Sequence, residues 1–235
     1  MDLDTIWKRA RGDLTVTTKQ GDPDVFLWEH SYRVAQVAQR IAHLPEVRPH
    51  DPDELAIVAA ALYHDAGWAI RWRDGEIERS EILLGPTTDT ACEQAATLME
   101  QSLAGFLPPG TLERAARAVR GLNDREPTSV EAQVVVEANN LEEFGLLLLW
   151  PAIRRGMVDG KGIQAVIDSW RRKKEYQFWS ARLRDSFRFP AIREIAERRL
   201  ERLEQFMMQL EEQHLGTDVV TAPVTKPAQR ATRVS

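Results

Sequence analysis

Two neighbouring polar residues end an otherwise apolar helical stretch of the sequence. His64 and Asp65 lie within L-Y-H-D-A-G-W, residues 62–68. Adjacent helical residues point about 100° apart, so both can reach one ion only where the helix ends or its neighbours crowd in. A neutral imidazole nitrogen and a carboxylate oxygen together suit a borderline divalent metal such as Mn, Fe, Co, Ni or Zn. We therefore interpret the pair as candidate metal ligands, and a further carboxylate is expected later in the chain.

His30 is the candidate that could meet this pair. It lies on a predicted helix over 26–43, four residues before Val34, on the apolar stripe that continues through Val37 and Ile41. A histidine on an apolar stripe faces the interior. Two readings follow, a hydrogen-bonded core histidine and a third metal ligand.

Helical periodicity runs through nearly the whole chain and predicts an all-α fold of about seven to eight helices. Asp51 or Asp53 is expected to cap the third helix and Gly67 to stop it, with a loop over 68–86. The predicted helices span 3–12, 26–43, 52–65, 88–104, 110–121, 128–143, 160–186 and the long amphipathic 191–213.

One helical domain is expected over residues 1–215. Its motif-bearing core lies at 26–145 and its C-terminal helices at 160–213. The segment 216–235 has no hydrophobic period and is rich in Thr, Pro and basic residues, which predicts a disordered tail.

Composition narrows the class of protein. The chain of 235 residues is 43% apolar, carries a net charge of −5 and has one cysteine, Cys92. The acidic balance disfavours nucleic acid as a partner, and a lone cysteine excludes an intramolecular disulfide. The longest apolar run, 144–153, is too short to cross a membrane, and the N-terminus does not read as a secretory signal. We expect a cytoplasmic protein.

Four stretches in order resemble the HD-domain superfamily of metal-dependent phosphohydrolases. W-E-H-S-Y-R-V-A at 28–35 resembles the first-histidine helix, and A-A-L-Y-H-D-A-G at 60–67 resembles the histidine-aspartate motif. E-A-N-N-L-E-E-F-G at 137–145 resembles the segment with the last ligand. The run R-E-I-A-E-R-R-L-E-R-L-E-Q-F-M at 193–207 is similar to the closing helix of a subgroup of small stand-alone bacterial members.

The resemblance implies a compact helical fold around a metal site made of His30, His64, Asp65 and Asn139, with Asp65 also the catalytic residue. In the family, the ion activates a water and stabilises charge on a phosphoryl group, and typical substrates are nucleotide phosphoesters. This chain departs from the pattern because Asn139 stands where the family has an aspartate. A divalent ion with these ligands keeps a formal charge of +1, which weakens metal binding but favours an anionic phosphate.

One ion is expected rather than two. Many family members hold a second metal through further histidines, and the chain has none between residues 66 and 138. Glu137, Glu142 and Asp124 are weaker candidates for the missing carboxylate.

Arginines near the motifs could bind a phosphate. The substrate-binding candidates are Arg33, Arg71, Trp72 and Arg73. Guanidinium groups suit phosphate oxygens, and an indole can stack on a base. The alternative for the last three is an exposed amphipathic loop, and Arg33 could pair with Glu29 or Glu137 instead.

Three hypotheses remain open. The first is an HD-type phosphohydrolase acting on a small phosphate ester, a nucleotide, with one divalent ion. The second is a catalytically degenerate relative that binds a nucleotide or a protein without turnover; Asn139 favours it. The third is an interaction protein that works through the helix 191–213 and the tail, and a homodimer is one partner of this kind.

Overall fold

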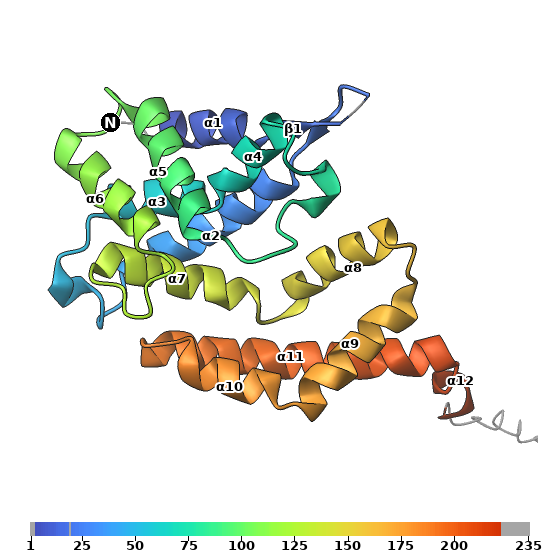
Figure 1. The fold of residues 1–235 in the computed structure, drawn as a ribbon. Helices are drawn as coiled ribbons and strands as arrows, with labels where there is room; N and C mark the ends of the chain where they lie inside the picture. The colour runs from blue at the N-terminus through green and yellow to red at the C-terminus, as the bar shows by residue number, and fades with distance from the viewer. Residues whose placement is uncertain (1–2, 19, 222–235) are drawn as a thin grey trace, which may run out of the picture.

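The computed structural model describes residues 3–18 and 20–221, and most of this part is helical (Figure 1). The first half contains α1 (Leu3–Leu14), β1 (Val16–Thr17), β2 (Pro23–Asp24), α2 (Phe26–Ala42), η1 (Arg48–His50), α3 (Glu54–Tyr63), α4 (Ala66–Arg73), η2 (Arg79–Glu81), α5 (Asp89–Leu103), α6 (Pro109–Arg120) and α7 (Val130–Glu142). The second half contains η3 (Leu146–Leu148), α8 (Leu149–Val158), α9 (Ile163–Glu175), α10 (Phe178–Asp185), α11 (Pro190–Leu215) and α12 (Asp218–Thr221). The all-α prediction is confirmed, but seven to eight helices was too few.

Helix α3 lies at the centre of the first half. Every residue from 56 to 63 is buried, and the helix packs against α2, α6 and α7. Three consecutive alanines, 59–61, allow these neighbours to approach closely. Asp53 caps the helix by accepting a hydrogen bond from the Ala56 backbone N–H at 3.1 Å, which selects it over Asp51. A fully buried helix thus supports the histidine-aspartate motif at its C-terminal end.

Gly67 does not stop this helix, and the prediction of a loop over 68–86 was wrong in its first part. The chain turns at His64 and Asp65 and immediately begins α4, with Gly67 buried inside it. A Cβ atom at Gly67 would lie 2.7 Å from the Ala91 carbonyl oxygen. The glycine is needed because α4 approaches the start of α5 too closely for any side chain.

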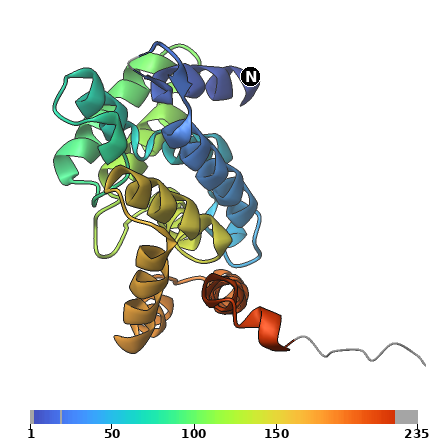
Figure 2. The same ribbon diagram turned by 90° about the vertical axis from the view of Figure 1, so that its right-hand side faces the viewer.

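Helices α9, α10 and α11 form a layer below the first half, and α8, level with α7, leads into it (Figures 1 and 2). The helix predicted over 160–186 is interrupted where Gln177 takes a left-handed backbone conformation with φ 52°. Helix α8 was not predicted at all. A ring cluster holds this layer to the end of α7: Phe144 contacts Trp179 and Phe187, and Trp179 contacts Trp170.

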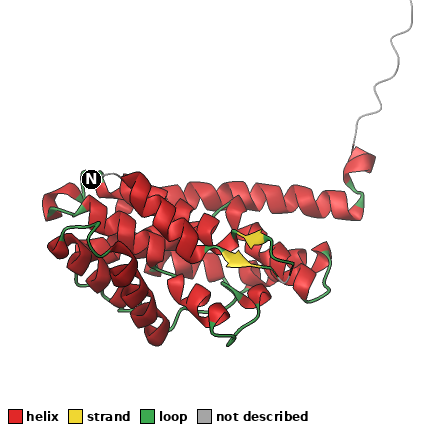
Figure 3. Ribbon diagram, turned by 90° about the horizontal axis from the view of Figure 1, so that it is seen from above, coloured by secondary structure: helices red, strands yellow, loops and turns green. Residues whose placement is uncertain are grey.

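Helix α11 extends along one side of the molecule (Figure 3). Its buried residues are Ile192, Ala196, Leu203 and Met207, whereas Phe206 is exposed. Of the predicted tail, residues 216–221 form a turn and α12, and 222–235 lie outside the described residues.

None of the described helices combines the length and the apolar character that a membrane crossing requires.

Candidate metal centre

Three side chains from two elements meet at one point. His30 projects from α2, and His64 and Asp65 form the turn between α3 and α4. The Nε2 atoms of the two histidines lie 3.2 Å apart. The Asp65 Oδ2 atom lies 3.4 Å from His30 Nε2 and 3.2 Å from His64 Nε2. The two candidate ligand sets found in the sequence therefore form one cluster.

The triangle of donor atoms has the dimensions of a coordination shell. Ligand atoms about 2.1 Å from a common ion lie roughly 3.0–3.4 Å from one another in tetrahedral or octahedral geometry. All three observed separations fall in or at the edge of this range. The donor set of two imidazoles and one carboxylate fits a borderline divalent ion.

The protein fixes the tautomer of His64. Its Nδ1 atom lies 2.8 Å from the Ala61 carbonyl oxygen, one turn earlier on α3. A carbonyl oxygen only accepts, so Nδ1 carries the proton and Nε2 keeps its lone pair for the triangle. The ring is buried, with 2% of the side chain exposed, and cannot turn away.

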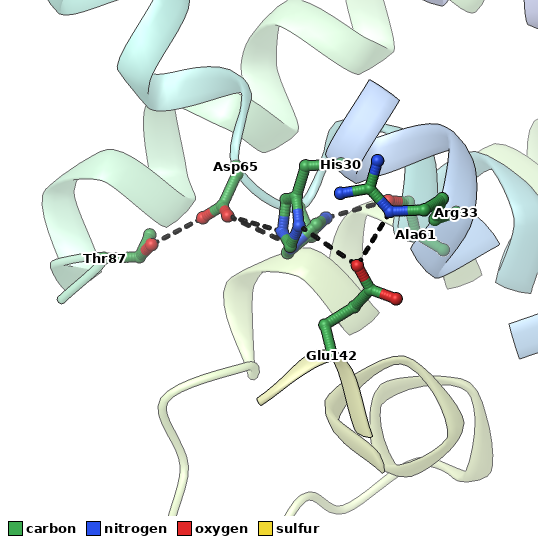
Figure 4. Close-up of polar contacts among 7 residues, drawn as sticks. His30, Arg33, Ala61, Asp65, Thr87 and Glu142 are labelled. Atoms are coloured by element: carbon green, nitrogen blue, oxygen red, sulfur yellow. Dashed lines mark hydrogen bonds and ion pairs between the residues drawn. The ribbon is translucent and has the colours of Figure 1, made fainter. Parts of the chain in front are cut away.

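Asp65 is held in the same way by a neighbour outside the triangle. The Thr87 hydroxyl donates to Asp65 Oδ1 at 2.5 Å, which leaves Oδ2 facing the two histidines (Figure 4). Asn123 in turn donates to the Thr87 carbonyl oxygen and to the Asp89 carboxylate. The loop before α5 thus orients the carboxylate, an arrangement that usually strengthens metal binding.

His64 and Asp65 also stabilise each other's charged forms. Burial alone would lower the pKa of His64, but the neighbouring Asp65 carboxylate, the Ala61 carbonyl and the Asn139 side chain raise it. Burial alone would raise the pKa of Asp65, yet the His64 and His30 imidazoles hold it well below its usual range. The carboxylate is therefore ionised, as a metal ligand must be.

An ion pair borders the cluster on the α7 side. The Arg33 Nε–H group donates to Glu142 Oε2 at 2.9 Å, and the same oxygen lies 4.0 Å from His30 Nδ1. Arg33 has neither Glu29 nor Glu137 as its partner. Its Nη groups make no hydrogen bond or ion pair with any described residue. The guanidinium edge is thus available beside the triangle.

Two cavities open onto the cluster, one on each side of Asp65. The larger, of about 270 Å³, is lined by His30, Arg33, Asp65, Trp68, Asn139 and Glu142 among others. The smaller, of about 170 Å³, is lined by His64, Asp65, Thr87, Cys92 and Asn139 among others. Burial raises the pKa of the Cys92 thiol to about 11, so this cysteine is no thiolate nucleophile.

Asn139 lies where the resemblance places it. It lines both cavities and interacts with the His64 ring. The carboxylates that could replace an acid there behave differently. Glu137 is buried and accepts hydrogen bonds from the Arg188 and Phe189 backbone N–H groups, and Asp124 is exposed on a loop. Only Glu142 lies next to the cluster.

The structure does not bring Arg71, Trp72 and Arg73 to the cluster. They lie on helix α4 rather than in a loop, and none of them lines either cavity. Arg71 pairs with Glu76, and Arg73 donates to the Asp13 carbonyl oxygen. Trp72 packs against the apolar core. Helical periodicity from Ala66 turns these side chains away from the motif, and Trp68 lines the larger cavity in their place.

Thr87 and Trp68 are the site residues that the sequence reading missed. Trp68 stands directly after the motif, and the G-P-T-T-D-T run around Thr87 reads only as a helix start. Thr88 indeed caps α5, while Thr87 turns to Asp65. No spacing rule links Thr87 to a residue 22 positions away, so its role required the fold.

Comparison with known proteins places the sequence in a family. The sequence model of the HD domain matches residues 27–143, a range that includes the whole donor triangle, Asn139 and Glu142. No match is found among curated proteins.

Three solved structures share the fold. Bacillus subtilis YpgQ in complex with ADP is 18% identical, with a TM-score of 0.56 over 90% of this chain and 97% of that one. The selenomethionine form of the same protein is 20% identical, with a TM-score of 0.55 over 91% of this chain and 97% of that one. A predicted HD superfamily hydrolase from an uncultured Thermotogales bacterium is 17% identical, with a TM-score of 0.52 over 90% of this chain and 92% of that one. The HD-domain match and this shared fold agree, and the chain belongs to the HD-domain superfamily.

Proposed function

We propose that the protein is a metal-dependent phosphohydrolase of HD type that acts on a small phosphate ester, a nucleotide. The observation that carries the proposal is the triangle of His30 Nε2, His64 Nε2 and Asp65 Oδ2, with edges of 3.2–3.4 Å. These three atoms would hold one divalent ion, Mn, Fe, Co, Ni or Zn, and Asn139 would complete the ligand set. When bound, such an ion polarises a phosphoryl oxygen and activates water.

The chain's own residues would position the ester. The Nη groups of Arg33 would bind a phosphate in the larger cavity, while Glu142 holds the guanidinium through its Nε–H group. Asp65 keeps its charge because the imidazoles stabilise it, and it acts from within the cluster as the catalytic ligand. Trp68 and Phe26 supply apolar wall for the rest of the substrate. That YpgQ was crystallised in complex with ADP supports a nucleotide as the ligand class.

A second candidate function is nucleotide binding without turnover. Asn139 is the observation that favours it, because an amide leaves the centre one negative charge short. In this reading His30, His64, Asp65 and Asn139 form a hydrogen-bonded polar core.

Metal content separates the two functions. Tag-free protein and a His64→Ala variant, prepared identically, are assayed by mass spectrometry after exposure to Mn, Co, Ni or Zn. Hydrolase function requires close to one ion per chain in the wild type and its loss in the variant, followed by turnover in a phosphatase and nucleotidase screen. No retained ion in either protein would contradict it.

An Asn139→Asp variant sharpens this test. If the wild-type centre is functional, the added charge tightens metal binding by a factor of ten or more and leaves turnover measurable in both proteins. If only the variant binds an ion, the chain is the degenerate relative, and thermal stabilisation by nucleotide without metal is then expected.

A further inference from the structure

The smaller cavity beside His64 adjoins another hollow that faces away from the cluster. This hollow, of about 130 Å³, shares Val136 and Asn140 with the cavity. These two residues lie one turn apart on α7. Leu122 and Asn123 line the cavity, and the next two residues, Asp124 and Arg125, line the hollow. We call the two adjoining spaces the groove; its lining runs from Asp65 to Arg188, in the segment between α10 and α11.

Three arginines surround the far end of this groove: Arg125, Arg182 and Arg188. Arg182 is paired with Glu143 and also donates to the Asn140 side-chain oxygen. Arg188 donates one N–H group to the Arg125 carbonyl oxygen and has no carboxylate within 4.0 Å among the described residues. The Arg125 guanidinium makes no hydrogen bond or ion pair with any described side chain. Two guanidinium groups therefore have donors to spare.

The acidic residues nearby do not occupy the guanidinium donors of Arg125 and Arg188. Glu137 has its carboxylate engaged by the backbone N–H groups of Arg188 and Phe189. Asp185 is paired with Arg184 on the exposed surface. Asp124 remains as the acid on the groove wall. Three basic and three acidic side chains line this hollow, so their formal charges balance, and the end of the groove is distinguished by its excess of hydrogen-bond donors.

A buried hydroxyl group completes the set. Ser186 lines the same hollow, is 9% exposed, and its Oγ has no hydrogen-bond partner among the described residues. Its backbone carbonyl accepts from Asn140 Nδ2 at 3.1 Å, which fixes the residue against α7. A buried hydroxyl without a partner costs free energy that a bound acceptor would recover.

We propose that the Arg125, Arg188 and Ser186 end of the groove binds a phosphate group, as an anion site separate from the metal cluster. Guanidinium groups without a carboxylate partner and a free hydroxyl are the donors that a phosphate accepts from. Gln133 at this end and Asn139 at the cluster lie roughly 9 Å apart along α7, at about 1.5 Å per residue. The phosphate belongs either to a separate effector or, resting on the proposed function, to the same molecule whose ester bond lies at the cluster.

Inorganic pyrophosphate tests the site directly. It is titrated into the full chain without metal by calorimetry, with wild type compared with an Arg125→Ala, Arg188→Ala double variant and with Ser186→Ala. Arg184→Ala is the matched control, because Arg184 lies in the same segment but pairs with Asp185 and does not line the hollow. Thermal unfolding of each variant checks the fold.

The expected result is saturable binding that weakens at least tenfold in the double variant and less than twofold in Arg184→Ala. The His64→Ala variant should bind as well as wild type, so this result stands even if the proposed hydrolase function fails. Equal binding by wild type and the double variant, loss of binding in His64→Ala, or no binding by the wild type would overturn the proposal.

Kinetics then separates the two sources of the phosphate. With metal-loaded enzyme, the double variant should raise KM for a nucleoside 3′,5′-bisphosphate but not for a 5′-monophosphate if the substrate supplies the group. If an effector supplies it, both KM values stay unchanged and the response of the rate to added pyrophosphate is lost.

Discussion

The two halves of the molecule are stabilised in different ways. Helix α3 buries every residue from 56 to 63, whereas α8 buries only Gly156 and α10 only Trp179. One apolar core fills the first half and extends into the C-terminal layer at fewer positions, among them Ile192 and Leu203. A ring cluster around Phe144 attaches this layer to the first half, and ion pairs such as Lys174 with Glu204 join its own helices to one another. The cluster of His30, His64 and Asp65 lies in the first half, beside the helix with the most continuous burial.

Two carboxylates join the halves, and their pKa values are shifted in opposite directions. Asp24 on β2 accepts from Arg79 and Arg154, which ties α8 to the loop before α5. Burial alone would raise the pKa of Asp24, but these guanidinium groups lower it. Glu137 on α7 accepts from the backbone at the start of α11, and burial raises its pKa to about 7. The contacts between the halves therefore depend on pH in two regions: below about pH 4 through Asp24, and near pH 7 through Glu137.

Matched leucine substitutions test the difference between the halves most strongly. Leu62 in α3 and Leu203 in α11 are both fully buried. Leu62→Ala should lower the free energy of unfolding by about 4 kcal/mol, and Leu203→Ala by about 2 kcal/mol, because an edge helix can move inward to fill part of the cavity. Urea denaturation followed by circular dichroism measures both. Equal losses would mean that the two layers are equally rigid.

Gly67→Ala tests the close packing beneath the motif. A methyl group 2.7 Å from the Ala91 carbonyl oxygen forces α4 away from α5, and we expect a loss of about 3 kcal/mol. Gly110→Ala is the control, since a Cβ atom there meets nothing within 4 Å, and its stability should change by less than about 1 kcal/mol. Thermal unfolding distinguishes the two. A tolerated Gly67→Ala would show that the motif does not depend on this contact.

The pH dependence of stability tests the contact between Glu137 and the backbone before α11. The folded protein keeps a proton on Glu137 between pH 4.5 and 7, where the unfolded chain has lost it. This contribution is fully present below pH 4.5 and is lost as the pH rises through about 7, and it amounts to at most about 3 kcal/mol. Glu137→Gln removes the titration, so the stability of wild type minus variant should fall from pH 4.5 to 7.5. A difference that rises with pH would show that the backbone N–H groups favour the charged carboxylate.

Asp24→Asn should have the smallest effect, about 1–2 kcal/mol at pH 7, because Arg79 and Arg154 are partly exposed. Its pH dependence has the opposite sign. The folded pKa of Asp24 is lowered, so its contribution is present above about pH 4 and is lost as the pH falls through the folded pKa. Chemical denaturation at pH 7 and pH 3 checks both statements, and an unchanged difference at pH 3 would contradict the ion-pair assignment.

The sequence predicted the first half better than the second for a physical reason. Periodicity located α2, α5, α6 and α7 to within about two residues because each has one buried and one exposed face. In the C-terminal layer few positions are buried, so the sequence of α8 shows no clear hydrophobic period. The break at Gln177 has no glycine or proline to mark it in the sequence. His30, His64 and Asp65 could be grouped by residue type, whereas Thr87 reaches Asp65 only through the packing of α4 on α5.

The hydrogen bond from His64 to the Ala61 carbonyl has a consequence for how this centre can change during evolution. A backbone carbonyl is present whatever residue occupies position 61, so substitution of that side chain does not by itself remove the acceptor that orients the imidazole. Asparagine and aspartate codons differ by a single nucleotide. One base change at position 139 therefore exchanges the two residues, and it leaves the acceptor that orients His64 in place.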